Sequence, residues 1–292
     1  MAFTSLDDLI AKLSQGQTTG SVVWNKQTNA AALTAGRWYD ASSWAGTPVA
    51  NAWAGTALNW KTCDETTGNG TQIFGMPHAG NVASATKHIV NAMAVTPGLV
   101  PGVLMLVDMQ GYYPGISLNS ATAQTLVGTP TLRYTNGVGV RAFLVTTTAS
   151  GATAHNIAYS YTNSAGASGK TNPVTVAATA SAIVSHLTHS GTAANNYGPF
   201  LPLASGDSGI QSVQSVTISA ASGSGAAALV LARPIAILPI TTAGVAVERD
   251  FVNQFPSLPR IIDGACLTWL YFAGGATASS TNFYGSIEAA WS

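Results

Sequence analysis

The feature that most constrains the fold of this chain is a series of short β-prone segments separated by turn residues. From about residue 131 onward, segments rich in Val, Ile, Thr and Tyr alternate with clusters of Gly, Ser, Asn and Pro. The segments have the length of ordinary strands, and the residues between them favour tight turns. Strands are therefore expected at 155–162, 173–177, 213–219, 227–238, 267–272 and 284–289, and a fully buried strand is expected upstream at 103–107.

A hairpin is also expected early in this half of the chain. The dipeptide Asn136-Gly137 lies between the β-prone residues 132–135 and 138–148. Asn-Gly is the preferred turn for a hairpin, because both positions must adopt positive φ. The pattern therefore predicts two antiparallel strands joined at residues 136 and 137.

Three segments carry apolar residues at helical spacing. Near the N-terminus, Ser5 and two acidic residues form a helix start, and the pattern stops before Gly16. Its apolar stripe consists of Leu6, Leu9, Ile10 and Leu13. A helix this short is not stable alone, so the stripe is expected to dock either on the chain's own body or on a neighbouring subunit. With further helices at 84–94 and 179–189, the chain is predicted to be mainly β, sandwich-like or jelly-roll-like, with two or three short α-helices.

Tryptophan is concentrated in one part of the sequence. Five of the seven tryptophans fall within residues 24–60, namely Trp24, Trp38, Trp44, Trp53 and Trp60. Rings at this density can form sugar-binding platforms, interface anchors or plain core, and the sequence leaves the three roles open. The predicted organisation is an N-terminal docking arm (1–20), a tryptophan-rich body (21–130 with 241–292) and a β-rich domain (131–240).

Charge is scarce, and this excludes several classes of partner. Eleven basic residues balance eleven acidic ones, and charged residues are 8% of the chain, against roughly 25% in a typical soluble domain. A dispersed, balanced charge gives no footprint for nucleic acid and no polybasic patch for a membrane. The longest apolar stretch, 226–240, is interrupted by Arg233 and Pro234. The N-terminus lacks the features of a secretory signal, so synthesis in a reducing cytoplasm is expected.

The residue types that usually carry chemistry are few and scattered. Cys63 and Cys266 are far apart in the sequence; a disulfide between them and a small apolar role for each both remain open. His186 and His189 could face one metal or stabilise a helix C-terminus, but two ligands leave a zinc site incomplete. We therefore predict no metal, cofactor or catalytic residue.

Two weaker catalytic patterns are present. Residues 206–209 read Gly-Asp-Ser-Gly, which resembles the nucleophile loop of chymotrypsin-like serine proteases, but the next residue is Ile210 rather than glycine. The same four residues are also good turn chemistry. Glycosidases use two carboxylates across a cleft, and an arrangement such as Asp108 with Asp263 stays open.

The texture of the whole chain resembles that of virion proteins of tailed bacteriophages. The resemblance is carried by an Ala-, Gly-, Ser- and Thr-rich, charge-poor β sequence, including the stretches 34–40 (TAGRWYD) and 193–203 (AANNYGPFLPL). It implies a non-enzymatic capsid decoration, cement or minor capsid protein of the virion, made in the host cytoplasm. The implied partners are further copies of the chain, with a trimer favoured, and the major capsid protein or other virion proteins.

Three functions are therefore carried forward. The first is the virion structural protein, for which Leu6, Leu9, Ile10, Leu13, Trp24, Trp38 and Trp44 are the candidate interface residues. The second is a glycan-binding tail or receptor-binding adhesin that uses exposed tryptophans such as Trp44 or Trp53. The third is a hydrolase that works from Ser208 or from a pair of acids.

Overall fold

The computed structural model describes residues 3–15, 19–78, 82, 85–98, 101–173, 176–178, 184–190, 197–254 and 258–292. The described structure is mostly β and all of the strand ladders are antiparallel, which confirms the predicted mainly β, sandwich-like fold. In the described part there are two α-helices, α1 (Leu6–Gln15) and α2 (Phe251–Gln254), and two short 3-10 helices, η1 (Ala41–Ser43) and η2 (Thr135–Gly137).

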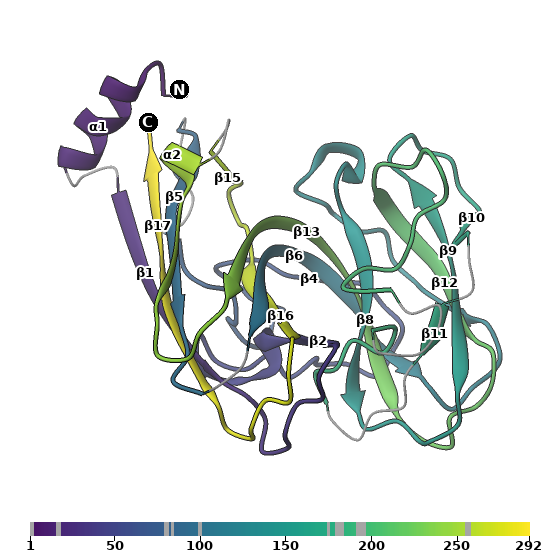
Figure 1. The fold of residues 1–292 in the computed structure, drawn as a ribbon. Helices are drawn as coiled ribbons and strands as arrows, with labels where there is room; N and C mark the ends of the chain where they lie inside the picture. The colour runs from purple at the N-terminus through teal and green to yellow at the C-terminus, as the bar shows by residue number, and fades with distance from the viewer. Residues whose placement is uncertain are drawn as a thin grey trace.

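The strands form three sheets, which we call terminal, central and distal (Figure 1). The terminal sheet contains the first and last strands of the chain, in the order β14-β5-β17-β1-β3, with β15 also paired to β5. Its strands are β1 (Thr19–Gln27), β3 (Ala45–Thr47), β5 (Lys87–Val95), β14 (Val247–Asp250), β15 (Arg260–Ile261) and β17 (Asn282–Trp291).

The central and distal sheets hold the remaining strands. The central sheet has the order β2-β16-β6-β13-β8, with β4 also on β6, and consists of β2 (Arg37–Asp40), β4 (Lys61–Thr62), β6 (Gly102–Ser117), β8 (Arg141–Thr148), β13 (Ala226–Ile240) and β16 (Leu267–Ala273). The distal sheet has the order β10-β9-β12-β7, with β11 on β9, and consists of β7 (Gln124–Thr125), β9 (His155–Asn163), β10 (Lys170–Thr171), β11 (Val176–Ala178) and β12 (Ile210–Ile218).

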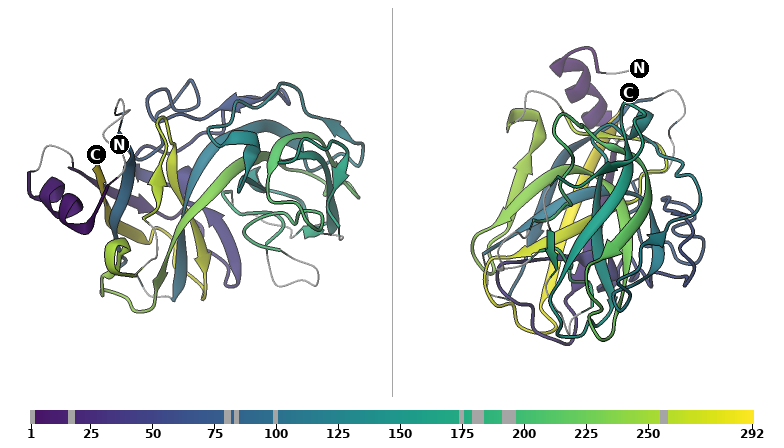
Figure 2. Two further views of the ribbon diagram at one scale, coloured as in Figure 1. Left: turned by 90° about the horizontal axis from the view of Figure 1, so that it is seen from above. Right: turned by 90° about the vertical axis from the view of Figure 1, so that its right-hand side faces the viewer.

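Two long strands, β6 and β13, join the two ends of the molecule. They pair along almost their whole length, and three register shifts bend the ladder, which is visible as a curved pair of ribbons in Figures 1 and 2. Leu104 and Leu106 of β6 lie in a first core, shared with the terminal sheet. Tyr113 and Ile116 of the same strand lie in a second core, shared with the distal sheet. One strand therefore supports both ends of the molecule.

A short irregular segment, residues 185–188, closes the central sheet. Its backbone hydrogen-bonds with residues 38–40 on one edge of the sheet and with residues 144–146 on the other edge. The central sheet is thus closed into a continuous ring. In order, the ring consists of β2, β16, β6, β13, β8 and the closing segment. A third group of buried side chains, which we call the ring core, includes Leu187 with Val107, Val230 and Leu270 from the surrounding strands.

The closing segment corrects one of the predicted helices. Residues 179–189 were expected to be helical, but 184–189 form turns and bridges, and 179–183 lie outside the described residues. Ser185 has a φ of 70°, which no α-helix accommodates. Val184 and Leu187 have the spacing of one helical turn, but they do not share a buried face. Leu187 enters the ring core, whereas Val184 is exposed.

The predicted helix at 84–94 is also wrong, because residues 87–95 form strand β5. The ladder between β5 and β17 shifts register between Glu288 and Ala289, so that the neighbours Ile89 and Val90 are both buried, in different clusters. A bulge of this kind produces two adjacent buried residues, which a helical periodicity also predicts.

The expected hairpin at Asn136-Gly137 does not form. Asn136 has a φ of 55° and Gly137 a φ of 66°, as the dipeptide predicts, but they belong to η2. Val138 then bridges to Gly209 instead of pairing with residues 132–135. The other expected strands overlap β6, β9, β11, β12, β13, β16 and β17. The overlap with β11 is limited to residues 176 and 177, because residue 173 is a bend and residues 174 and 175 lie outside the described part.

The predicted domain boundaries remain predictions. β6 lies before residue 131 and β13 after it, and the two strands belong to the same sheet. The predicted arm and body meet where Leu9 of α1 packs against Val90 and Ala290.

Candidate functional site

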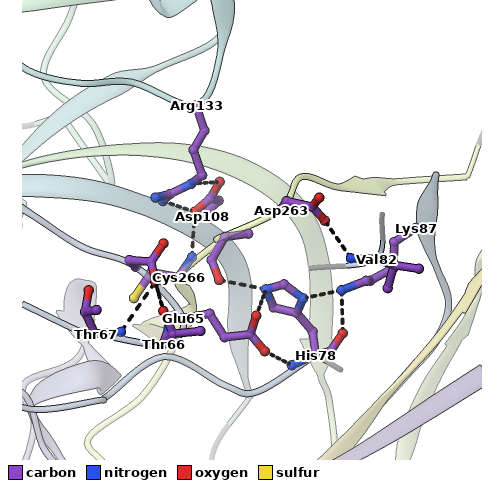
Figure 3. Close-up of polar contacts among 12 residues, drawn as sticks. Glu65, Thr66, Thr67, His78, Val82, Lys87, Asp108, Arg133, Asp263 and Cys266 are labelled. Atoms are coloured by element: carbon purple, nitrogen blue, oxygen red, sulfur yellow. Dashed lines mark hydrogen bonds and ion pairs between the residues drawn. The ribbon is translucent and has the colours of Figure 1, made fainter. Parts of the chain in front are cut away.

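A cluster of titratable side chains lies inside the molecule, where the loop of residues 63–78 meets β5 and the turn before β16 (Figure 3). His78 is its centre. The Nε2 atom of His78 is 2.8 Å from the carbonyl oxygen of Ala265 and 3.3 Å from Oε2 of Glu65, and its Nδ1 atom is 2.8 Å from Nζ of Lys87. All three side chains are at most 6% exposed.

The hydrogen bonds fix the protonation pattern of this cluster. Lys87 is a donor to Nδ1 and also to the backbone carbonyl of His78, so the ring nitrogen facing Lys87 accepts. Burial and the charge of Lys87 lower the pKa of His78, which is consistent with a neutral ring between the carboxylate of Glu65 and the ammonium group. Burial also lowers the pKa of Lys87.

A second buried ion pair lies beside the first cluster. Asp108 of β6 is fully buried, and both of its carboxylate oxygens accept from Arg133, from Nε at 3.1 Å and from Nη2 at 2.5 Å. Arg133 also donates to the carbonyl oxygens of Cys63 and Met109. Asp108 in turn accepts from the backbone N–H of Cys266 at 2.9 Å. The pair thus ties three separate segments to β6.

The side chains of Glu65, His78, Lys87 and Asp108 bond with neighbouring segments and are nearly or completely buried. The two acids considered from the sequence as a glycosidase pair have different surroundings. Asp108 is saturated by Arg133, whereas Asp263 accepts from the backbone N–H of Val82, on the other side of the cluster (Figure 3).

The Gly-Asp-Ser-Gly loop also serves a structural role. Asp207 accepts from Tyr161 and Asn163, both at 2.6 Å, and these hydrogen bonds lower its pKa. The Oγ of Ser208 lies 2.7 Å from the Oγ of Ser164. A second hydroxyl cannot act as the general base that a serine nucleophile needs at neutral pH. The loop therefore fixes the end of β9 and gives no support to a hydrolase.

The two histidines predicted on a helix lie instead in and beside the closing segment. Nε2 of His186 is 3.0 Å from the carbonyl oxygen of Ser190, and Nε2 of His189 is 2.9 Å from that of Pro199. Burial lowers the pKa of His186 to about 3 and that of His189 to about 4. Among the described residues, no group of three or more His, Cys, Asp or Glu side chains could hold a metal ion.

The tryptophans named as interface anchors are mostly core. Trp24 and Trp44 are at most 1% exposed and lie in the first core, where Trp24 packs against Trp269. Trp38 is half-buried and packs against Phe272. Trp53 is also buried. The rings that a glycan-binding site would use, Trp44 and Trp53, are therefore inside the molecule.

The helical stripe, by contrast, is largely on the surface. Leu9 is 4% exposed and packs on Val90 and Ala290, whereas Leu6, Ile10 and Leu13 are 59%, 53% and 38% exposed. Figures 1 and 2 show α1 projecting from the end of the terminal sheet, beside both chain termini. Of the four stripe residues, only Leu9 is thus buried.

The sheet face next to α1 carries both apolar and polar side chains. On this outer face of the terminal sheet, Val23 is 75% exposed and Tyr284 is 42% exposed, with Met93 and Val95 half-buried beside them and Ser286 and Glu288 on the same face. A groove of about 280 Å³ separates α1 from this sheet and is lined by Leu13, Val90 and Ala289 and by the polar residues Thr19, Ser21 and Glu288. The periodicity of the sequence predicted the helix. It did not predict the sheet face, because the exposed residues of β1 and β17 alternate with buried ones and are not adjacent in the sequence.

The outer face of the distal sheet is polar. The outward residues of β9 are Asn156, Ala158, Ser160 and Thr162, and those of β12 are mainly serine, threonine and glutamine. The two ends of the molecule therefore offer different surfaces to a partner.

Comparison of the chain with protein-family models, with curated proteins and with solved structures gives no match. No described helix has the length and apolar character needed to cross a membrane.

Proposed function

We propose that this chain is a non-enzymatic virion structural protein of the capsid decoration, cement or minor capsid type, and that it associates with further copies of itself. The association uses a docking surface made of Leu6, Ile10 and Leu13 on α1 with Val23 and Tyr284 on the terminal sheet. The single observation that carries the proposal is the exposure of three of the four stripe residues of α1.

The physical argument concerns what covers these residues. A helix of 10 residues that buries one of its four stripe residues is marginal, because most helical stability in proteins comes from packing of the apolar face. Covering the exposed parts of three large aliphatic side chains contributes about 1–2 kcal/mol for each one. A second copy of the chain presents the same stripe, and a net charge of zero leaves no overall charge repulsion between two copies.

The buried polar groups of the interior also support the proposal. The buried ion pairs and the neutral histidines are engaged within the chain, so a mechanical role fits them better than a chemical one. In the proposed role, the oligomer, with a trimer favoured, binds the major capsid protein or other virion proteins and stabilises their lattice by mass action.

Light scattering on a sizing column, at two protein concentrations tenfold apart, tests the self-association. The proposal predicts a mass several times 29.7 kDa that does not fall on dilution. A mass of 29.7 kDa at both concentrations would overturn it. The virion role is tested separately, by incubating the protein with shells of its cognate capsid protein and measuring whether the shells withstand higher temperature.

A further inference from the structure

The two cysteines, 203 positions apart in the sequence, meet on one edge of β6. β4 ends at Thr62 and β16 begins at Leu267, and both pair with β6 on the edge that β13 does not occupy. The N–H of Cys63 donates to the carbonyl oxygen of Gln110, and the N–H of Met109 donates to that of Cys266. The two strand ends therefore face neighbouring residues of β6, with one cysteine at each end.

The two side chains enter the same part of the interior. Both are fully buried, and both belong to the ring core. The main chains around them are fixed by the Asp108–Arg133 pair, since Arg133 donates to the carbonyl of Cys63 and Asp108 accepts from the N–H of Cys266. Two thiols held together by a common ion pair are pre-positioned to bond.

We propose that Cys63 and Cys266 are a latent disulfide, present as thiols after synthesis and closed by a peroxide. In the first step, hydrogen peroxide oxidises one thiol to a sulfenic acid and releases water. In the second step, the other sulfur attacks the sulfenic sulfur, the S–O bond breaks, and a second water leaves as the S–S bond forms. Two thiols and one peroxide give one disulfide and two waters.

The environment slows the oxidation of the thiols. The neighbouring thiol of Cys63, followed by burial, raises the pKa of the Cys266 thiol, so little thiolate, the form that reacts with peroxide, is present at neutral pH. Peroxide is small and uncharged, whereas bulky disulfide reagents need the ring to open. The disulfide would join β4 directly to β16 and close a loop of about 200 residues, which is expected to raise Tm by about 5–10 °C. The inference is independent of the proposed function, because both sulfurs lie inside one chain.

The test uses the intact protein. It is treated with hydrogen peroxide while folded, then denatured, alkylated with iodoacetamide and analysed by mass spectrometry before and after reduction. The expected product is a monomer that takes up no alkyl group, contains a peptide joined through Cys63 and Cys266, and takes up two alkyl groups after reduction. Cys63→Ser and Cys266→Ser serve as matched controls, in which the remaining sulfur should gain oxygen or form an intermolecular dimer.

Two results would overturn the proposal, and neither depends on the variants folding. In the first, the wild-type protein still takes up two alkyl groups after peroxide treatment that oxidises a free thiol fully. In the second, both cysteines carry separate oxygen atoms as sulfinic acids and no joined peptide is found.

Discussion

The terminal and distal sheets each cover one half of the central sheet, and both enclose cores of large, fully buried side chains. The first core contains Trp24, Trp44 and Trp269, and the second contains Tyr113, Tyr159 and Tyr161. Their outer faces differ. The terminal sheet carries α1, Val23 and Tyr284 outward, whereas the distal sheet presents hydroxyl and amide side chains.

This difference separates stability from association. Burial of large side chains in the two cores explains why both ends of the molecule are folded. The cores lie inside the molecule, so they give no reason for one end rather than the other to bind a partner. The exposed apolar stripe of α1 does give such a reason, since exposed apolar patches mark interaction sites. Each of the following predictions tests one side of this distinction.

The largest expected effect comes from the ion pair that lies where the two halves of the central sheet meet. Asp108→Ala leaves Arg133 buried without its carboxylate and is expected to cost about 3–5 kcal/mol of unfolding free energy. Because β6 supports both cores, denaturant unfolding followed by tryptophan fluorescence and by circular dichroism should show one coincident transition at a lower midpoint.

Asp7→Ala, at an exposed position of α1, is the matched control and should change stability by less than about 0.5 kcal/mol. Two separated transitions in the Asp108→Ala protein would contradict the view that the two ends share one support.

The next effect in size concerns pH and the closing segment. The folded-state pKa values of about 3 for His186 and about 4 for His189 lie below the unfolded value of 6.5, so the unfolded chain binds more protons in acid. The stability that these residues contribute is complete above pH 6.5 and is lost as pH falls towards 4. The loss between pH 6.5 and 5.5 is about 2 kcal/mol for the two residues together.

Urea unfolding at the two pH values measures this loss. The His189→Gln variant keeps a side-chain N–H for the carbonyl of Pro199 but cannot titrate, so it should lose about 1 kcal/mol of the pH dependence. An unchanged pH dependence in this variant would show that other groups control the acid sensitivity.

The sequence predicts those elements whose signals are local. The helix at residues 6–15 has its start, acidic first turn and stripe within one short segment, and the long strands have continuous β-prone residues. β5 and residues 184–189 were mistaken for helices. In β5 a bulge buries two adjacent residues, whereas in residues 184–189 the helically spaced Val184 and Leu187 do not share a buried face. In both segments, pairing with residues distant in the sequence determined the structure.

The buried clusters could not be predicted in the same way. Glu65, His78 and Lys87 are separated by 13 and 9 positions and match no motif, and they meet only because the loop of residues 63–78 folds back onto β5. Asp108 and Cys266 likewise depend on the pairing of β6 with β16. The sequence showed that many large rings were present. It did not show whether they lie in a core or at an interface, because both locations favour the same residue types.

A smaller effect distinguishes the outer faces of the two sheets. Val23→Ser removes the most exposed of the large apolar side chains, so the unfolding free energy should change by less than about 0.5 kcal/mol. The proposed docking surface includes this residue, and self-association should therefore weaken several-fold, as measured by sedimentation. Ala158→Ser, on the outer face of the distal sheet, is the control and should leave both quantities unchanged.

The central claim is that copies of this chain meet through α1, and one comparison of variants tests it most directly. Ile10 and Ile73 are both 53% exposed, but Ile10 lies on the docking surface and Ile73 in the loop of residues 63–78. Light scattering of the two serine variants beside the wild-type protein is expected to show the oligomer for wild type and Ile73→Ser, and dissociation towards 29.7 kDa for Ile10→Ser. An oligomer that survives Ile10→Ser unchanged, or a wild-type protein that is monomeric throughout, would contradict the claim.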